Sequence, residues 1–256
     1  MIEILVVNCN TSTEMTATIG AAAQAAAAPD ARVSATNPRW GPPSADGFYD
    51  SFRTAAAVLE TLTELDGSYD GVVLAGFGEH GREGARQLLD VPVVDITEAA
   101  AIAACLVGHR FGVVTTGRTA VGQIQDSLHT FGLAHRCVSV RATGIAVLDL
   151  DDAVEHTVQA FAEVGRRVIE EGADTIVLGC AGLSRFREVL SARLEVPVVD
   201  GVTAAVAMCE GLVRIGLRTS KAGAFAAPDL SRAGLRHPAP AVPAGQRLVS
   251  GQQPTN

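Results

Sequence analysis

Cys180 is the side chain of this sequence best suited to chemistry. It ends the short run Asp174-Thr-Ile-Val-Leu-Gly-Cys180, and Ala181-Gly182 and a predicted helix follow it. The N–H groups at a helix start favour negative charge, so we expect them to lower the pKa of this thiol and to favour the thiolate, its reactive form. A buried core cysteine is the alternative interpretation, because a free cysteine also packs as a small hydrophobic side chain.

The run that ends at Cys180 occurs twice in the sequence. Asp70-Gly-Val-Val-Leu-Ala-Gly76 aligns with it without a gap, and Val91-Pro-Val-Val-Asp95 aligns with Val196-Pro-Val-Val-Asp200 further along. This repeat predicts two similar halves related by a pseudo-twofold axis, with equivalent strand ends facing one cleft. Gly76 stands where the second copy has Cys180, so the two sides of that cleft are expected to differ chemically.

Other side chains near the predicted strand ends can also transfer protons. His80, in the loop Gly76-Phe-Gly-Glu-His-Gly81, is a candidate general acid or base near neutral pH, although many loop histidines are exposed and have no role. Cys9 follows the first predicted strand and is either a proton donor or a packed loop residue. Glu79 is the other ionisable side chain of the Gly76 loop.

The Gly76 loop also has the pattern of a dinucleotide-binding motif. It reads G-x-G-x-x-G, follows a predicted strand, and has Asp95 nineteen residues after Gly76. However, the strand–helix–strand unit from 71 to 95 spans only 25 residues, against about 30 in nicotinamide-binding folds. Its internal duplicate carries Cys180-Ala-Gly instead of the motif. The repeat therefore favours a small substrate held between the halves, with nicotinamide binding as a minor alternative.

Composition restricts the class of protein. A chain of 256 residues with 48% hydrophobic content suits one large or two small domains with a substantial core. Its apolar stretches around residues 21–28 and 99–107 are too short to span a bilayer, so we expect a cytoplasmic protein. A net charge of −8 argues against nucleic acid or an anionic membrane as a partner and favours a small molecule.

The five cysteines are expected to be reduced thiols. Their number is odd, and none of them forms a C-x-x-C pair. Cys105, Cys137 and Cys209 fall within apolar strand or helix patterns, where packing is the expected role.

Short β-branched runs alternate with alanine-rich helical patterns along the chain, which is typical of parallel sheets crossed by helices. Strands are predicted at 4–8, 32–36, 71–76, 92–96, 111–116, 137–141, 175–180 and 197–200. Helices are predicted at 13–27, 47–65, 82–90, 97–107, 119–131, 151–171, 183–194 and 202–216. The segment 37–44, rich in Pro and Gly, is predicted to be an ordered loop.

The expected fold class is therefore α/β, with two similar Rossmann-like domains that each contain a four-stranded parallel sheet flanked by helices. Residues 1–96 plus 201–221 are predicted to form the first domain and residues 97–200 the second. The tail 229–256 has no apolar periodicity and is predicted to be disordered.

Ligands of open parallel sheets bind beyond the carboxyl ends of the strands. The residues there are small or polar and can hold a carboxylate, imide or enolate oxygen through hydroxyl, amide and backbone N–H groups. The predicted substrate-binding residues are Asn10, Thr11, Gly76, Phe77, Gly78, Thr115, Thr116, Ala181 and Gly182.

Several of these segments together resemble a known family over residues 1–228, the aspartate/glutamate racemase superfamily and within it the hydantoin racemases. The motifs that carry the resemblance are Ile4-Leu-Val-Val-Asn-Cys-Asn-Thr-Ser12, Asn37-Pro, Gly41-Pro-Pro-Ser44, Val177-Leu-Gly-Cys-Ala-Gly182 and Thr219-Ser-Lys221. The resemblance implies two domains with the site between them, often a homo-oligomer, and no metal or pyridoxal cofactor. It also implies that one cysteine removes a proton from a chiral carbon while a second returns one on the opposite face.

Cys180 matches the second cysteine of the family, but Gly76 stands where the first is expected. Arylmalonate decarboxylases, another branch of the superfamily, resemble this chain in having only the second cysteine, which protonates an enolate after CO₂ is lost. We rank racemisation at a carbon next to a carbonyl of a hydantoin-like or amino-acid-derived substrate first. Decarboxylation of a malonate-type acid is second, and non-catalytic binding is third. Cys180 and His80 are the predicted catalytic residues, with Glu79 and Cys9 as alternatives to His80.

Overall fold

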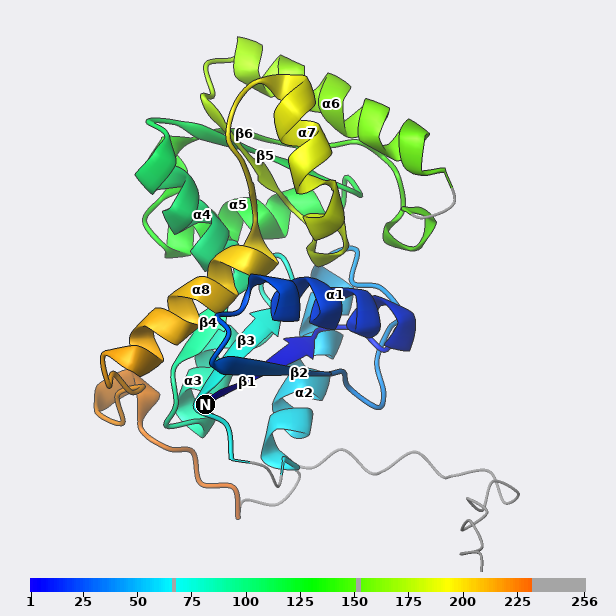
Figure 1. Ribbon diagram of the computed structural model, residues 1–256. Helices are drawn as coiled ribbons and strands as arrows, with labels where there is room; N and C mark the ends of the chain where they lie inside the picture. Colours follow the sequence, from blue (N-terminus) through cyan, green and yellow to red (C-terminus); the bar gives the residue numbers. More distant parts are fainter. Residues whose placement is uncertain (66–67, 151–152, 232–256) are drawn as a thin grey trace, which may run out of the picture.

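Two parallel sheets of four strands form the framework of the molecule (Figure 1). The computed structural model describes residues 1–65, 68–150 and 153–231. In the first sheet the order is β2-β1-β3-β4, and in the second it is β6-β5-β7-β8, so the two sheets share one topology. The strands are β1 (Ile2–Asn8), β2 (Ala31–Thr36), β3 (Gly71–Ala75), β4 (Val93–Asp95), β5 (Phe111–Thr115), β6 (Cys137–Ala142), β7 (Thr175–Leu178) and β8 (Val198–Asp200). The predicted fold class is confirmed.

Helices cover both sheets. They are α1 (Thr13–Ala26), α2 (Phe48–Thr63), α3 (Arg82–Leu88), α4 (Ile96–Val107), α5 (Ala120–Thr130), α6 (Val154–Glu170), α7 (Arg187–Leu194) and α8 (Gly201–Arg214). Short 3₁₀ helices are η1 (Ala134–Arg136), η2 (Val147–Asp149), η3 (Ala181–Phe186) and η4 (Gly223–Phe225). One prediction needs correction, because the helix expected at 183–194 is divided into η3 and α7. The predicted helix start at 151–152 lies outside the described residues.

The two halves exchange a helix. The chain leaves β4 of the first sheet into α4, which packs against β7 and β8 of the second sheet. It leaves β8 into α8, which packs against β1, β3 and β4, and Figure 1 shows α8 in gold running from the boundary along the first half. A Cβ atom on Gly201 would lie 2.5 Å from the carbonyl oxygen of Ile96, so the two helix starts meet between the halves.

This exchange joins the cores of the two halves. Ile4 and Val73 of the first sheet belong to the same buried apolar cluster as Phe111 and Val113 of the second. The central strands are buried along almost their whole length, as expected for parallel strands covered on both faces. The division into domains at residues 96 and 200 stays a prediction. The tail predicted at 229–256 lies outside the described residues from 232 onward.

The segment 37–44 is an ordered loop, as predicted. The indole N–H of Trp40 donates to Glu60 over 2.7 Å, and the carbonyl of Pro42 accepts from the backbone N–H of Thr11 over 3.1 Å. The loop is therefore fixed to α2 and to the segment that follows β1.

The Thr219-Ser-Lys221 motif has a structural role. The ammonium group of Lys221 donates to the carbonyls of Arg86, Gln87 and Leu89 at the end of α3. These carbonyls lack helical partners, so the lysine caps the helix that follows the Gly76 loop.

Candidate active site

A small cavity lies at the carboxyl ends of β1, β3, β5 and β7, where the two halves meet. Its volume is about 40 Å³. It is lined by Asn8, Cys9, Asn10, Met15, Ala45, Ala75, Gly76, Phe77, His80, Thr115, Thr116, Ala120, Val147, Gly179, Cys180 and Ala181. Met15 and Val147 also line a neighbouring compartment of about 150 Å³. We refer to these as the inner and the outer compartment.

Cys180 forms one wall of the inner compartment. Its backbone is extended, with φ −160° and ψ 138°, and directly precedes η3. Burial raises the pKa of the Cys180 thiol to about 11, the N–H of Gly182 opposes this shift, and the negative charge of Asp46 adds to it. The expected lowering of this pKa by a helix start is therefore wrong, because desolvation outweighs the nearby N–H group.

Gly76 forms another part of the inner compartment, and no side chain fits there. A Cβ atom on Gly76 would lie 2.7 Å from Cβ and 2.9 Å from Sγ of Cys9, and it would also collide with the Cδ2 atom of His80. These two side chains occupy the space that a cysteine at position 76 would use.

The imidazole of His80 is held by the protein on both nitrogens. His80 is 3% exposed, with Nδ1 2.9 Å from the Thr54 hydroxyl and Nε2 3.4 Å from the Phe77 carbonyl. Burial lowers the pKa of His80 to about 4 against a smaller opposite effect of the Phe77 carbonyl, so the ring is neutral at physiological pH. Its carbon edge, with Cδ2, faces Gly76.

Cys9 presents a second thiol to the same compartment. It is 7% exposed, and burial raises its pKa to about 12. Charge on Cys180 and on Asp95 raises this pKa further, while the backbone N–H of Cys9 lowers it. Each thiol is therefore protonated at neutral pH, and the two lie close enough for their charges to interact.

The polar side chains near the two thiols differ in whether they are already hydrogen-bonded within the protein or can bind a ligand. The Thr115 hydroxyl donates to the Gly179 carbonyl over 2.8 Å. Thr116 is 3% exposed, and its hydroxyl has no hydrogen bond to any of the residues that the structure describes. Asn10 accepts from the N–H of Ser12 over 3.0 Å and so shapes the loop after β1. Thr116 is thus the hydroxyl best placed to meet a ligand oxygen.

The structure brings most of the predicted site residues together. Those that line the inner compartment are Asn10, Gly76, Phe77, His80, Thr115, Thr116, Cys180 and Ala181. The other three predicted residues, Thr11, Gly78 and Gly182, do not line this compartment. Thr11 bonds to the Pro42 carbonyl, the N–H of Gly78 donates to the Thr97 hydroxyl, and Gly182 lines the outer compartment.

Sequence reasoning missed several lining residues. Met15, Ala45 and Val147 come from α1, the loop before α2, and η2. None of them lies directly after a strand, so the rule that ligands bind beyond the carboxyl ends of the strands does not indicate them. They reach the site because separate segments pack over the strand ends, and a local sequence pattern does not encode this.

Asp95, which completed the dinucleotide-binding pattern, has a different role. Its carboxylate accepts from the N–H groups of Thr97 and Glu98 over 2.8 and 3.0 Å and caps α4. It is 1% exposed and lies 4.0 Å from the guanidinium of Arg82, which is 2% exposed. A carboxylate used in this way is not available to bind a ribose.

The fold and the cleft define a class, that of α/β proteins whose site lies between two halves of the same topology. Residues 4–209 match the family model described as Asp/Glu/Hydantoin racemase. The chain therefore belongs to this family, and it is an isomerase of the racemase type.

Individual relatives agree with this assignment. A hydantoin racemase from Pseudomonas sp. (strain NS671) is 35% identical over 229 residues, which cover 89% of this chain and 92% of that protein. The structure of an allantoin racemase from Pseudomonas fluorescens has a TM-score of 0.87 at 45% identity, covering 89% of this chain and 97% of that one. An arylmalonate decarboxylase, at 18% identity and a TM-score of 0.55 over 84% of this chain and 94% of that one, shares the fold alone.

Residues 1–65, 68–150 and 153–231 contain neither a membrane-spanning helix nor a cluster of metal-ligating side chains. No helix in these segments has the length and apolar character needed to cross a membrane. Nor do these segments contain a group of three or more His, Cys, Asp or Glu residues that could hold a metal ion.

Proposed function

We propose that this protein racemises a 5-substituted hydantoin, the cyclic ureide in which C5 lies next to a carbonyl, without a cofactor. Allantoin, which carries a ureido group on C5, is the first candidate substrate. Membership of the racemase family supports the reaction, and the likeness to an allantoin racemase at 45% identity supports the substrate.

One observation carries this proposal: the inner compartment is lined by Cys180 of the second half and by two side chains of the first half that can transfer protons, Cys9 and His80. Inversion of a carbon centre needs a base on one face and an acid on the other, because the intermediate carbanion is planar. We assign Cys180 to one face. We assign the opposite face of the carbanion to a group of the first half near Gly76, where the sequence predicts His80.

The intermediate of this reaction carries negative charge on the carbonyl oxygen next to C5. The hydroxyl of Thr116 and the backbone N–H groups after β7 are the donors that we propose for this oxygen. Preorganised donors of this kind stabilise an enolate more than the neutral substrate, and so they lower the barrier.

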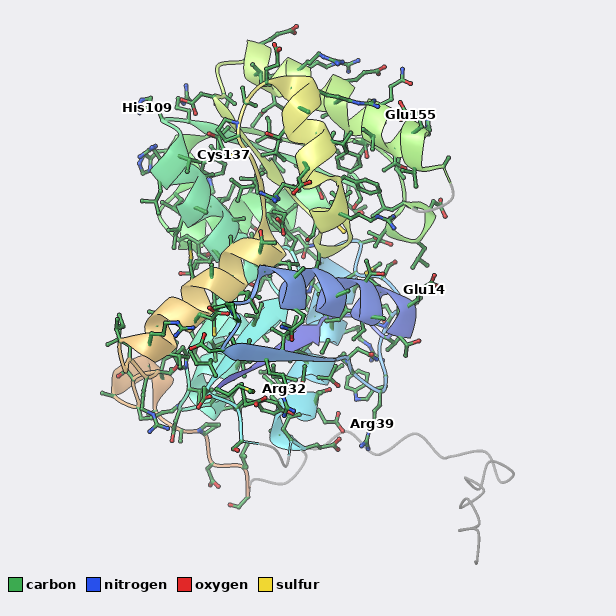
Figure 2. All side chains as sticks on the ribbon, viewed as in Figure 1. Glu14, Arg32, Arg39, His109, Cys137 and Glu155 are labelled. Carbon is green, nitrogen blue, oxygen red and sulfur yellow. The ribbon has the colours of Figure 1, made fainter. Side chains whose placement is uncertain are left out.

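The outer compartment is the proposed position of the C5 substituent. Its volume of about 150 Å³ exceeds that of the inner compartment, and its lining combines polar and apolar groups. It is lined by Ser12, Glu14, Met15, Thr18, Val147, Leu148, Leu150, Gly182 and Arg185. In Figure 2, Glu14 lies at the exposed start of α1, near the boundary between the halves. Carboxylate, hydroxyl and guanidinium groups suit a substituent with several N–H and C=O groups, such as a ureido group.

We also infer a cytoplasmic homo-oligomer that acts on a small molecule, with neither nucleic acid nor a membrane as a partner. The net charge of −8 supports the exclusion of nucleic acid and of anionic membranes.

The direct test follows the circular dichroism of one allantoin enantiomer with the purified protein. We expect the signal to decay to zero faster than in buffer while the allantoin concentration stays constant. A decay equal to the buffer rate for both allantoin and 5-benzylhydantoin would contradict the proposed function. Racemisation of 5-benzylhydantoin alone would keep the reaction and reject the polar substituent.

Decarboxylation is the second candidate, and Gly76 is the observation that favours it. A site with a single working thiol delivers a proton to one face only, which suits protonation after CO₂ is lost. Release of CO₂ from a disubstituted malonate, together with no exchange at C5 of either hydantoin enantiomer, would establish this alternative.

A further inference from the structure

We propose that Cys9 is the second proton-transfer group, so that the thiol absent from position 76 is supplied by the neighbouring strand. This inference rests on the proposed racemase function and deepens it. It identifies the group that works on the face opposite Cys180.

Strand register places Cys9 beside Gly76. Asn8 at the end of β1 pairs with Ala75 at the end of β3, and Cys9 and Gly76 are the first residues after these two strands. The sulfur of Cys9 lies 2.9 Å from the position that a Cβ atom on Gly76 would take. The Cys9 thiol therefore fills the space in which a side chain from position 76 would begin.

The second half of the molecule shows the reverse arrangement. Val114 of β5 pairs with Leu178 of β7, so the same register brings Thr116 beside Cys180. In the second half the thiol, Cys180, follows β7 and has Thr116 as its neighbour. In the first half the thiol, Cys9, follows β1 and has Gly76 as its neighbour. Both thiols line the inner compartment.

Cys9 suits this role better than His80. Both ring nitrogens of His80 face groups of the protein, the Thr54 hydroxyl and the Phe77 carbonyl, and the ring turns a carbon edge toward Gly76. A carbon edge does not transfer a proton. We therefore regard His80 as a positioning residue that packs beside the Cys9 side chain.

The proposed step is balanced in protons and electrons. The active form carries one thiolate and one thiol. The thiolate takes the proton from C5, and the electron pair of the C–H bond moves into the enolate. The thiol on the other face then protonates C5 and becomes the thiolate. The opposite enantiomer reacts through the same groups in reversed roles, so no further reactant is needed.

The test compares Cys9→Ala, Cys180→Ala and the control Cys137→Ala in deuterated water. Cys137 begins β6 and lies in the outer part of the second half, away from the boundary (Figure 2). Each variant is given each enantiomer of the substrate, and both inversion and deuterium incorporation at C5 are measured. Cys137→Ala is expected to keep wild-type rates.

For Cys9→Ala we expect racemisation to fall by about 100-fold or more, the usual size of a lost acid–base group. One enantiomer should still exchange its C5 hydrogen with retention, because Cys180 remains on that face. Cys180→Ala should show the same behaviour with the other enantiomer. Thermal melting checks that each variant is folded, and Cys9→Ser, which keeps the shape of the side chain, repeats the test should Cys9→Ala unfold.

Wild-type racemisation by folded Cys9→Ala or Cys9→Ser would overturn the inference. Loss of inversion in His80→Gln together with normal inversion in Cys9→Ala would assign the role to His80. Failure of the proposed function has a different signature, because the wild-type protein itself would then exchange neither enantiomer.

Discussion

The two halves of this molecule share a scaffold and differ at the site. Both sheets have the same strand order, and an aspartate at the end of the fourth strand caps the helix that crosses to the other half. At the cavity, however, one half presents Cys180 beside Thr116, and the other presents Cys9 and His80 around Gly76. The shared scaffold therefore places one proton-transfer group on each side of the cavity. The strand that this group follows differs between the halves.

Removing the thiol of the second half should have the largest effect on activity. For Cys180→Ala we expect racemisation to fall by about 1,000-fold, because no other side chain of that wall replaces the base. The melting temperature should change by only a few degrees, since the lost side chain is small. Racemisation within tenfold of wild type would show that the halves do not share the reaction as proposed.

The two capping aspartates, Asp95 and Asp200, allow the stability of the two halves to be compared at equivalent positions. Asp95 lies 4.0 Å from the buried Arg82, whereas Asp200 lies 3.7 Å from Arg187, whose side chain is 44% exposed. Arg82 keeps Glu79 and Glu83, each at 2.8 Å, when Asp95 is removed. Asp95→Ala should therefore lower the free energy of unfolding by about 2 kcal/mol, through the loss of a helix cap and of one buried charge partner. Asp200→Ala should cost about 1 kcal/mol, the usual value of a lost helix cap.

Urea titration at pH 8.5 measures both costs. This pH is chosen because burial, opposed by Arg82, raises the pKa of Asp95 to about 7, and the carboxylate must be ionised for the comparison. Equal losses of stability in Asp95→Ala and Asp200→Ala would show that the buried charge pair adds nothing to the first cap.

The rate should depend strongly on pH, because the active form needs one thiolate. Burial raises the pKa of Cys180 to about 11 and of Cys9 to about 12, and the nearby carboxylates of Asp46 and Asp95 act in the same direction. A raised pKa keeps a thiol protonated at neutral pH, so the thiolate fraction rises about tenfold per pH unit below the pKa. We therefore expect kcat/KM to rise about 100-fold from pH 7 to pH 9 after subtraction of the uncatalysed rate. A flat profile would mean that the thiolate already exists at neutral pH.

The Gly76 side should not tolerate even a methyl group. Because a Cβ atom there would collide with Cys9 and His80, Gly76→Ala should lower the free energy of unfolding by about 2 kcal/mol. Gly211→Ala is the matched control, since no heavy atom lies within 4 Å of its added Cβ atom in α8, and it should stabilise the helix by up to about 1 kcal/mol. Equal melting temperatures for the two variants would contradict the crowding around Gly76.

Much of this arrangement could be predicted from the sequence. The repeat of Asp70–Gly76 in Asp174–Cys180 specified two equivalent halves, and apolar runs specified the buried strands because each is covered on both faces. The same pattern placed Cys180 at the end of a strand, and the structure has it two residues beyond the end of β7. These features depend on local sequence, and the structure has them where they were expected.

Other features depend on contacts between distant segments. The pKa of Cys180 is set mainly by the residues that bury it. The nearby helix start therefore did not indicate that this pKa is raised. The Thr54 hydroxyl holds one ring nitrogen of His80, and strand register places the Cys9 thiol beside Gly76. Both contacts join segments that are distant in the sequence. Met15 and Val147 reach the site from outside the strand ends, and no sequence motif marks them.

The central claim is that two groups on opposite faces share one proton transfer. Its most direct test starts the wild-type protein with one enantiomer of allantoin in deuterated water and analyses both enantiomers at low conversion. We predict that the newly formed enantiomer carries deuterium at C5 while the remaining starting enantiomer carries none. Deuterium that enters the starting enantiomer without inversion would contradict the account. It would show that one group removes and returns the proton on the same face of the carbanion.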